Sequence, residues 1–300
     1  MPSIFLAQTQ DEKLLIIDGY QRVMTVRDYV RGIFSGDEKP FSLSRTEKIN
    51  KRWRGKQFAE LTEAEQRKIK NTTIHAIIFA QQKEPQNEDT SLFQVFERIN
   101  TSGRTLTAQE IRNCVAQGRF NKLLIRLNEY PVWRDLFGLD VPEPRMRDME
   151  YILRFFALSS EDFKSGEQER LSLRQFLDVF IRKHSNLSQQ QEEDMEVRFK
   201  SAIDLASSLF GNSAFHNISP SDNTKYVQKF SPTIFDSILI AIDSAIQRGI
   251  SNLEGPQERK TRLLQDERYR FVISKETMRR SSIKERINKV SNFIFGVDYE

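Results

Sequence analysis

The sequence predicts an α+β protein in which a small mixed sheet with helices comes first and a mostly helical region follows. Short β-rich apolar runs lie in the first third of the chain. From about residue 90 the apolar residues recur at the spacing of helices. With 38% apolar residues and 22 Phe among 300, the chain can fill a sizeable core. We therefore expect two domains, residues 1–119 and residues 120–300.

Three short runs predict the strands of the sheet. Residues 4–7 and residues 14–17 are apolar, and the polar stretch QTQDEK separates them as in a hairpin. Residues 72–79, TTIHAIIF, form a third β-rich run. A small sheet accounts for all three runs.

A helix is predicted directly after the second strand. Its apolar residues recur at helical spacing, and they are Val23, Val26, Val30 and Phe34. We expect Gly36 to end this helix. The stretch LLIIDGYQR, residues 14–22, therefore contains a strand end, an Asp-Gly turn and a helix start in succession.

Capping patterns predict where helices begin and end in the rest of the chain. Thr107 is followed by Glu110 at the spacing of a capping box, and Gly211 and Gly249 are typical helix stops. The same box, or a serine cap with proline at the first helical position, recurs at three places: Ser172 with Gln175, Ser282 with Glu285, and Ser231 with Pro232. Residues 212–223 are predicted to form a mobile loop.

The composition argues against a membrane protein and against a disulfide scaffold. No stretch approaches the roughly 20 apolar residues of a membrane helix, and the first ten residues lack the features of a secretory signal. The single cysteine, Cys114, cannot form an internal disulfide, and no Cys/His pair has zinc spacing. We expect a cytoplasmic protein without a structural metal.

Basic residues gather in two segments although the net charge is only +4. Residues 45–70 contain nine Lys/Arg and four Glu, and residues 259–289 contain eleven Lys/Arg and four acids. These segments either form DNA-binding surfaces or contain the Lys and Arg side chains that commonly cover solvent-exposed helices. The sequence leaves both interpretations open.

The turn after the second strand has the residue types that bind phosphate. A strand-to-helix turn offers unpaired N–H groups and the positive end of the helix dipole. Gly19 can take a positive φ and lets an anion approach the backbone, and Arg22 supplies a planar fork of donors. Asp18 could hold Mg²⁺ through water or align a nucleophilic water, which Gln21 could also orient. The alternative is a plain Asp-Gly turn in which Arg22 pairs with an acid.

Tyr20 has two readings of its own. The ring could stack on a nucleotide base, or it could pack on the edge of the sheet.

A second polar cluster is predicted between two apolar helices. Residues 96–110 read FERINTSGRTLTAQE, so a helix is expected to end at Asn100 and the next to begin near Thr107. The turn between them would bring several polar side chains together around Gly103: Asn100, Thr101, Ser102 and Arg104. A plain helix-turn-helix corner explains the same residues.

Four segments together resemble, in order and spacing, the DGQQR-motif family. This is the N-terminal domain of GmrSD-type modification-dependent restriction enzymes and of phosphorothioate-sensing phage-defence proteins. The segments are DGYQR at 18–22, FERINTSGRTLTAQEI at 96–111, RMRDMEYILRFF at 145–156 and SSIKERINKVSNFI at 281–294. The resemblance covers nearly the whole chain.

The resemblance implies a ParB/sulfiredoxin-like core that binds and hydrolyses a nucleoside triphosphate with Mg²⁺. It implies a regulatory switch in restriction or anti-phage defence, with DNA and a separate nuclease subunit as partners. The family motif maps onto Asp18, Gly19, Gln21, Arg22, Asn100 and Gly103. The expected catalytic residues are Asp18 and Gln21, and the expected nucleotide-binding residues are Gly19, Tyr20, Arg22, Asn100, Gly103 and Arg104.

The sequence departs from the family pattern in two ways. Tyr20 replaces the usual middle glutamine of the motif, and the family's earlier segment with a Gln-Arg and aromatic signature is missing before the first strand. The three histidines, His75, His184 and His216, are isolated from one another, so we expect no histidine-dependent nuclease activity. The alternatives are a non-catalytic nucleic-acid or partner-binding module with a degenerate pocket, and a fragment without activity of its own.

Overall fold

A computed structural model describes residues 3–8, 12–35, 38–80, 93–95, 98, 106–222, 225–250 and 254–299. These residues divide into two compact units. The first holds residues 3–80 with Arg98, and the second holds residues 93–95 with residues 106–299. The predicted boundary at residue 119 stays a prediction.

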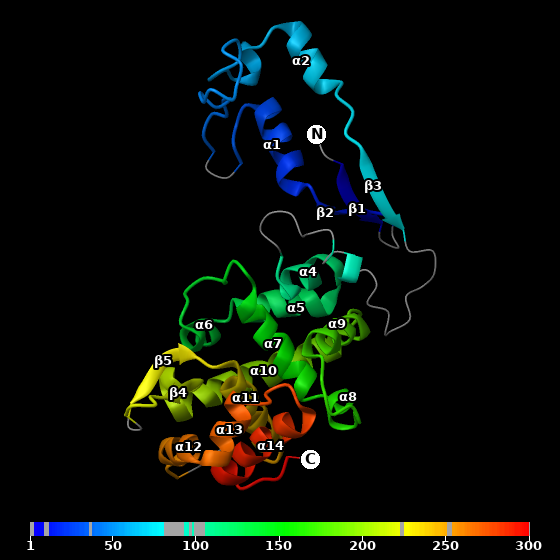
Figure 1. Ribbon diagram of the computed structural model, residues 1–300. Coiled ribbons are helices and arrows are strands. Elements are labelled where there is room, and N and C mark those ends of the chain that lie inside the picture. Colours follow the sequence, from blue (N-terminus) through cyan, green and yellow to red (C-terminus); the bar gives the residue numbers. More distant parts are fainter. Residues whose placement is uncertain are drawn as a thin grey trace. The chain divides into compact units, whose positions relative to one another are not determined.

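The first unit contains the mixed sheet that the sequence predicts. Strand β1 (Ile4–Gln8) lies between β2 (Leu14–Asp18) and β3 (Ala76–Ala80), as Figure 1 shows. β1 pairs antiparallel with β2 and parallel with β3. β3 begins four residues later than the predicted run at 72–79, because β1 has only five residues to pair with it and Ile4 N already bonds the carbonyl of His75 (2.9 Å).

Helix α1 (Tyr20–Arg31) follows β2 but ends earlier than predicted. Gly32, not Gly36, is its C-cap, with φ +79° and its N–H bonded to the carbonyls of Asp28 and Tyr29. Phe34 therefore lies outside the helix and contacts Phe41, with ring centroids 5.6 Å apart. The helical spacing of Phe34 was misleading because a left-handed glycine stops the helix two residues before it.

A small apolar cluster holds the rest of the first unit together. It forms where α1 meets η1 (Phe58–Glu60), with α2 (Glu63–Lys70) beside it. Tyr29, Phe58 and Leu61 are its buried members. The rings of Tyr29 and Phe58 meet edge to face with centroids 5.8 Å apart. This cluster is separate from the apolar interior of the second unit.

The second unit is mostly helical, as predicted, and the α+β class is confirmed. Its elements are α4 (Ala108–Val115), α5 (Arg119–Asn128), α6 (Pro131–Phe137), α7 (Arg147–Leu158), α8 (Glu161–Lys164), α9 (Leu173–Lys183), α10 (Gln189–Phe210), η2 (Gly211–Ser213), β4 (His216–Ile218), β5 (Tyr226–Phe230), α11 (Pro232–Gln247), α12 (Pro256–Gln265), α13 (Glu267–Ser274), α14 (Arg280–Val290) and the π-helical turn η3 (Ser291–Phe295).

Helix α11 forms the centre of the second unit. It contacts α7, α10 and α14, and Figure 1 shows it among them. Most of its residues are buried, which fits a helix that is apolar on nearly all sides. Trp133 of α6 is fully buried beside it, and its ring contacts those of Phe199, Phe230 and Phe235.

Most of the predicted helix ends are confirmed. Thr107 Oγ1 accepts from Glu110 N (3.1 Å) while Glu110 Oε2 accepts from Thr107 N (2.6 Å), which is the predicted capping box. Ser172 caps α9, and Ser231 precedes Pro232 at the start of α11. Gly211 and Gly249 follow α10 and α11 with positive φ.

Two predictions of the helical region are wrong. Helix α14 begins at Arg280, so Ser282 lies inside it, and Glu285 bonds the guanidinium of Arg268 instead of a helix start. The predicted mobile loop at 212–223 contains β4, which pairs with β5. A strand of three residues is too short to show a periodicity in the sequence.

Among the described residues, no helix is long and apolar enough to cross a membrane. In the same residues no group of three or more His, Cys, Asp or Glu side chains could hold a metal ion. Cys114 is half-buried, and burial raises the pKa of its thiol.

Candidate functional site

The DGYQR segment forms the strand-to-helix turn that the sequence predicts. β2 ends at Asp18, Gly19 is the N-cap of α1 with φ +98°, and the helix begins at Tyr20. No side chain caps this helix, and its first turn holds no acidic residue. The first amide groups of α1 therefore keep their positive partial charge without a side-chain acceptor.

Gly19 is required by packing as well as by its backbone conformation. A Cβ at this position would lie 2.6 Å from Cγ2 of Ile4 and 3.3 Å from Nη2 of Arg22. Ile4 comes close because Phe5 pairs with Asp18 in the β1–β2 register. These contacts explain why this position is a glycine even if no ligand binds there.

Arg22 lies against Asp18 at the corner. Its Nη2 donates to Oδ2 of Asp18 (2.6 Å), and its Nη1 donates to the carbonyl of Ser3 (3.1 Å). The two side chains are 28% and 30% exposed, so the ion pair is half-buried. The structure thus brings Asp18, Gly19 and Arg22 together, and the ion pair is the one expected if this is a plain Asp-Gly turn in which Arg22 pairs with an acid.

Ser3 and Ile4 belong to this corner, although no pattern in the sequence indicates them. Ser3 contributes a backbone carbonyl, which carries no residue-type signal. The hairpin spacing predicted that the first two strands pair. It could not predict the register that places Ile4 beside Gly19.

Tyr20 and Gln21 extend outward from the first turn of α1. Tyr20 is 60% exposed, and its ring makes no aromatic contact among the described residues. Gln21 is exposed, and its carbonyl accepts from Oγ1 of Thr25 (2.7 Å). Because the Tyr20 ring is this exposed, the structure does not support the interpretation that it packs on the edge of the sheet.

The second predicted cluster cannot be placed beside the first. Asn100, Gly103 and Arg104, with Thr101 and Ser102 between them, lie outside the described residues. Their part in a nucleotide site stays a prediction.

The basic segment at 259–289 presents few unpaired cations. Lys260, Arg280 and Arg286 are buried. Three further cations pair with acids of the same segment, namely Arg268 with Glu285, Arg279 with Glu276 and Lys289 with Asp266. Among the described residues, Arg262, Arg270 and Lys275 are the exposed cations of this segment that make no ion pair.

The basic segment at 45–70 keeps more of its cations available. Arg52 pairs with Glu65 (2.8 Å), whose pKa is lowered to about 2 by hydrogen bonds from Trp53 and Thr62. Arg67 pairs with Glu63. In the described part of this segment, five cations are exposed without an ion pair: Arg45, Lys48, Lys51, Lys68 and Lys70. Trp53 lies between these cations in the sequence, and its side chain is 38% exposed.

Comparison with known proteins identifies the first part of the chain. Residues 1–116 match the family model described as GmrSD restriction endonuclease, N-terminal domain. No curated protein and no solved structure matches the chain. The matched residues include the mixed sheet, the DGYQR turn and the start of the helical unit. Residues 1–116 therefore belong to the GmrSD restriction endonuclease N-terminal domain family.

Proposed function

We propose that the chain is a regulatory component of a modification-dependent restriction or anti-phage defence system that binds and hydrolyses a nucleoside triphosphate. The observation that carries this proposal is the corner at Gly19. There an open helix start, a carboxylate and a guanidinium converge within a domain of a restriction endonuclease family. This regulatory component would act on a separate nuclease subunit or on DNA.

The residues of the corner have the chemistry that a triphosphate requires. The first amide groups of α1 and the guanidinium of Arg22 are donors for phosphate oxygens. Asp18 is the one carboxylate of the motif, and Mg²⁺ is commonly bound through one or two carboxylates together with phosphate oxygens and water. Gln21 would orient the attacking water, and the exposed Tyr20 ring would stack on the base. Bound Mg²⁺ would neutralise charge on the phosphates.

The Asp18–Arg22 pair has a consequence for binding. Both side chains are held at the corner by the 2.6 Å contact and by the carbonyl of Ser3. A triphosphate must therefore share the guanidinium with Asp18 or displace the carboxylate toward the metal. We expect binding to depend on Mg²⁺, because the metal gives Asp18 a cation to replace Arg22.

The test is titration of the whole chain with ATP and GTP, with and without Mg²⁺. Replacing one charged donor to phosphate costs about 1.5–3 kcal/mol, so Arg22→Gln should weaken binding about tenfold or more. Arg27→Gln is the matched control, because Arg27 lies on the same helix, is exposed and donates to the Sδ of Met24 (3.3 Å) rather than to a group of the corner. Equal affinity of folded Arg22→Gln and wild type would reject the assigned corner.

Hydrolysis is tested separately from binding. Gln21→Ala should lower the turnover of the triphosphate while its affinity stays within about threefold, because an exposed amide that orients water acts on the reaction rather than on binding. Phosphate release measured beside binding distinguishes the two effects. Unchanged turnover would remove Gln21 from the site.

Non-catalytic DNA binding is the second candidate function, and one observation favours the segment at 45–70 for it. Among the described residues, this segment keeps five of its nine cations exposed without an ion pair, whereas 259–289 keeps three of its eleven. Lys48→Gln with Lys51→Gln should reduce the salt dependence of DNA binding by about 0.9 per lost phosphate contact. Arg262→Gln with Lys275→Gln is the matched control. Binding that does not change with salt would reject this function.

A further inference from the structure

A loop of the first unit, residues 43–56, is closed at its base by backbone hydrogen bonds. We call it the Trp53 loop. Leu43 N donates to the carbonyl of Lys56 (2.9 Å), and Gly55 N donates to the carbonyl of Leu43 (3.0 Å). Compact surface loops whose ends meet in this way frequently carry functional residues. The closed base gives the side chains of the loop a fixed frame.

Trp53 is held in this loop by the N–H edge of its indole. Its Nε1 donates to Oε1 of Glu65 on α2 (2.7 Å), and the same oxygen accepts from Nη2 of Arg52 (2.8 Å). The other oxygen of Glu65 accepts from the N–H and from the hydroxyl of Thr62, both at 2.9 Å. The Trp53 side chain is 38% exposed, and it contacts no other aromatic ring among the described residues. A fixed indole thus keeps part of its ring open to solvent.

Arg54 ties the two turns of the loop together. Its Nε donates to the carbonyl of Ile49 (2.6 Å), and its Nη2 donates to the carbonyl of Glu47 (3.1 Å). The turn that contains Lys48 is therefore held next to the segment that contains Trp53. Because backbone carbonyls carry no net charge, these hydrogen bonds leave the positive charge of Arg54 uncompensated.

The loop is strongly basic. Residues 44–55 contain five Lys/Arg and one Glu. Arg45, Lys48 and Lys51 are exposed and make no ion pair among the described residues. Arg45 lies beside Gly55, because a Cβ on that glycine would be 3.0 Å from Nε of the arginine. Cations in the same loop as an exposed indole combine attraction for phosphates with a surface on which a base can stack.

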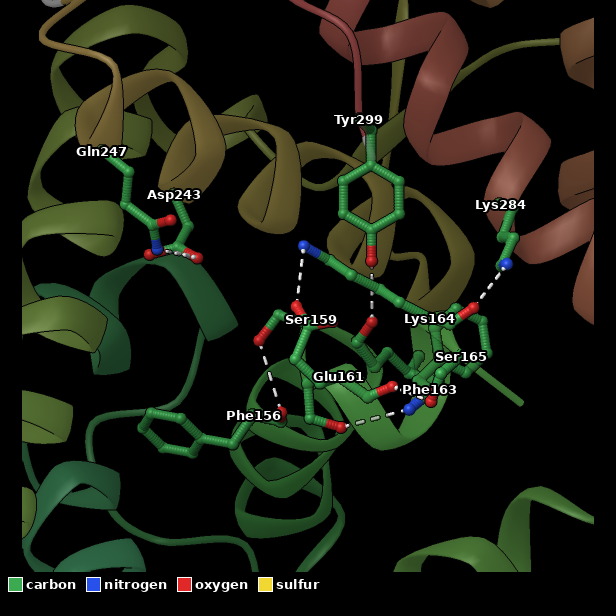
Figure 2. A network of polar contacts seen from close by, with 12 residues as sticks. Phe156, Ser159, Glu161, Phe163, Lys164, Ser165, Asp243, Gln247, Lys284 and Tyr299 are labelled. Carbon is green, nitrogen blue, oxygen red and sulfur yellow. Dashed lines mark hydrogen bonds and ion pairs between the residues drawn. The ribbon is translucent and has the colours of Figure 1, made fainter.

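One polar network of the second unit shows the contrast. Figure 2 draws it around the end of α7 and α8, where Nζ of Lys284 donates to the carbonyl of Lys164 (2.7 Å). Nζ of Lys164 in turn lies 3.5 Å from the carboxylate of Glu161. The cations of this network are bound by acceptors of the protein itself. The three exposed cations of the Trp53 loop have no acid partner in the described part of the chain, so the loop is the better surface for phosphates.

We infer that the Trp53 loop binds an unpaired DNA strand, with a base stacked on the Trp53 ring and the phosphates on Arg45, Lys48 and Lys51. The inference rests on the DNA-binding function proposed for residues 45–70, and it adds that the bound strand is single. In a duplex each base is covered on both faces by its neighbours, so a ring can stack only on a base outside the duplex stack. Every base has a face for stacking, so we expect little sequence preference.

Binding assays on the whole chain at constant ionic strength test this surface. The probes are an oligothymidylate of about ten nucleotides, an abasic strand of the same length, a G·C-rich duplex of the same length, and vesicles of phosphatidylserine with phosphatidylcholine. The abasic strand keeps the phosphates but has no bases. The oligothymidylate should therefore bind more tightly than the abasic strand and more tightly than the duplex, and the vesicles should not bind.

Trp53→Ala should abolish the preference for the strand that has bases. Its affinity for the oligothymidylate should fall about fivefold or more, the contribution of one stacked base. Phe271→Ala is the matched control, because Phe271 is similarly exposed (40%) and lies 5.3 Å from the guanidinium of Arg268 in the second unit. Lys48→Gln with Lys51→Gln should weaken binding of the oligothymidylate and of the abasic strand alike.

Fluorine NMR of the wild-type chain labelled with fluorotryptophan tests the stacking without a variant. The Trp53 signal should shift when the oligothymidylate binds, while the signal of the fully buried Trp133 should stay unchanged. This measurement keeps the test decisive where Trp53→Ala fails to fold.

Equal affinity for the oligothymidylate and the abasic strand, tighter binding of the duplex, or an unshifted Trp53 signal would overturn the unpaired strand as the ligand. DNA binding by the basic segment would stand in each of these cases. Vesicle binding that Trp53→Ala abolishes would assign the loop to a membrane surface instead. The absence of binding to every DNA probe would reject the DNA-binding function together with this inference.

Discussion

Gly19 and Gly32 lie at the two ends of α1, and both have positive φ, +98° and +79°. They differ in their surroundings. A Cβ at Gly32 would meet no atom within 4 Å, whereas a Cβ at Gly19 would lie 2.6 Å from Cγ2 of Ile4. Comparing alanine substitutions at the two glycines therefore separates two free-energy costs, that of the left-handed backbone conformation and that of the contact with Ile4.

We predict that Gly32→Ala lowers the free energy of unfolding by about 1–2 kcal/mol, the cost of a left-handed conformation for an L-residue. Gly19→Ala should cost more, because Ile4 must also move. Urea unfolding followed by the fluorescence of Trp53 measures both. Equal losses in the two variants would show that Ile4 yields without cost.

Lys260 is a buried cation without a carboxylate partner among the described residues. It is 1% exposed, its Nζ donates to the carbonyl of Ser213, and it lies 4.6 and 5.3 Å from the ring centroids of Tyr226 and Phe210. Burial lowers the pKa of Lys260 from 10.5 to about 7.

We predict that the helical unit gains stability as the pH rises from about 7 toward 10.5. In this range the unfolded lysine binds a proton that the folded one has released, so the free energy of unfolding increases with pH. Lys260→Met, which keeps an apolar stem and removes the charge, should flatten this dependence and raise stability most below pH 7. Urea midpoints across this range measure it. An unchanged slope would show that Lys260 is charged in the folded protein.

A buried ion cluster joins α7, α11 and α14. Asp236 of α11 accepts from Nε of Arg154 on α7 (3.1 Å) and from Nη2 of Arg286 on α14 (3.1 Å). All three side chains are buried. The two arginines come from the segments at 145–156 and 281–294, which the family resemblance singled out without a role. Their role in the fold is to share one carboxylate.

We predict that Asp236→Asn lowers the free energy of unfolding by about 3–5 kcal/mol, because it removes the carboxylate that two buried guanidinium groups share. Glu285→Gln is the control. It breaks the exposed pair with Arg268 and should cost at most about 1 kcal/mol. Urea unfolding followed by Trp133 fluorescence compares them. Similar losses would contradict a special role for the cluster.

The elements that sequence predicts well are those fixed by neighbours in the chain. The capping box at Thr107 and the strand-to-helix turn at Gly19 depend on residues within a few positions. The predicted capping box at Ser282 was wrong because the same spacing also occurs inside a helix, and here the helix begins at Arg280. Contacts between distant segments, such as Ser3 with Arg22 and Arg154 with Asp236, have no local pattern and could not be predicted.

Each of the two units has its own apolar core and its own tryptophan. Trp53 donates to Oε1 of Glu65 in the first unit (2.7 Å). Trp133 is fully buried in the second and donates to Oδ1 of Asn128 (3.0 Å). The core around Phe58 shares no member with the core around α11.

We predict that Phe58→Ala unfolds the first unit at lower urea concentration and leaves the second unchanged. Truncating a buried Phe costs about 3–5 kcal/mol, and this cost falls on the core that loses the ring. Fluorine NMR of protein labelled with fluorotryptophan gives one signal for each unit. A simultaneous shift of both transitions would show that the two cores unfold as one.

The enclosed amine of Lys260 also has a chemical consequence. An uncharged amine is the form that attacks acylating reagents, yet this one lies behind Tyr226 and Phe210 with almost no contact with solvent. Such reagents can reach it only while η2, β5 and α12 are apart. The rate at which Lys260 becomes acylated in native buffer therefore measures how often that part of the helical unit opens transiently.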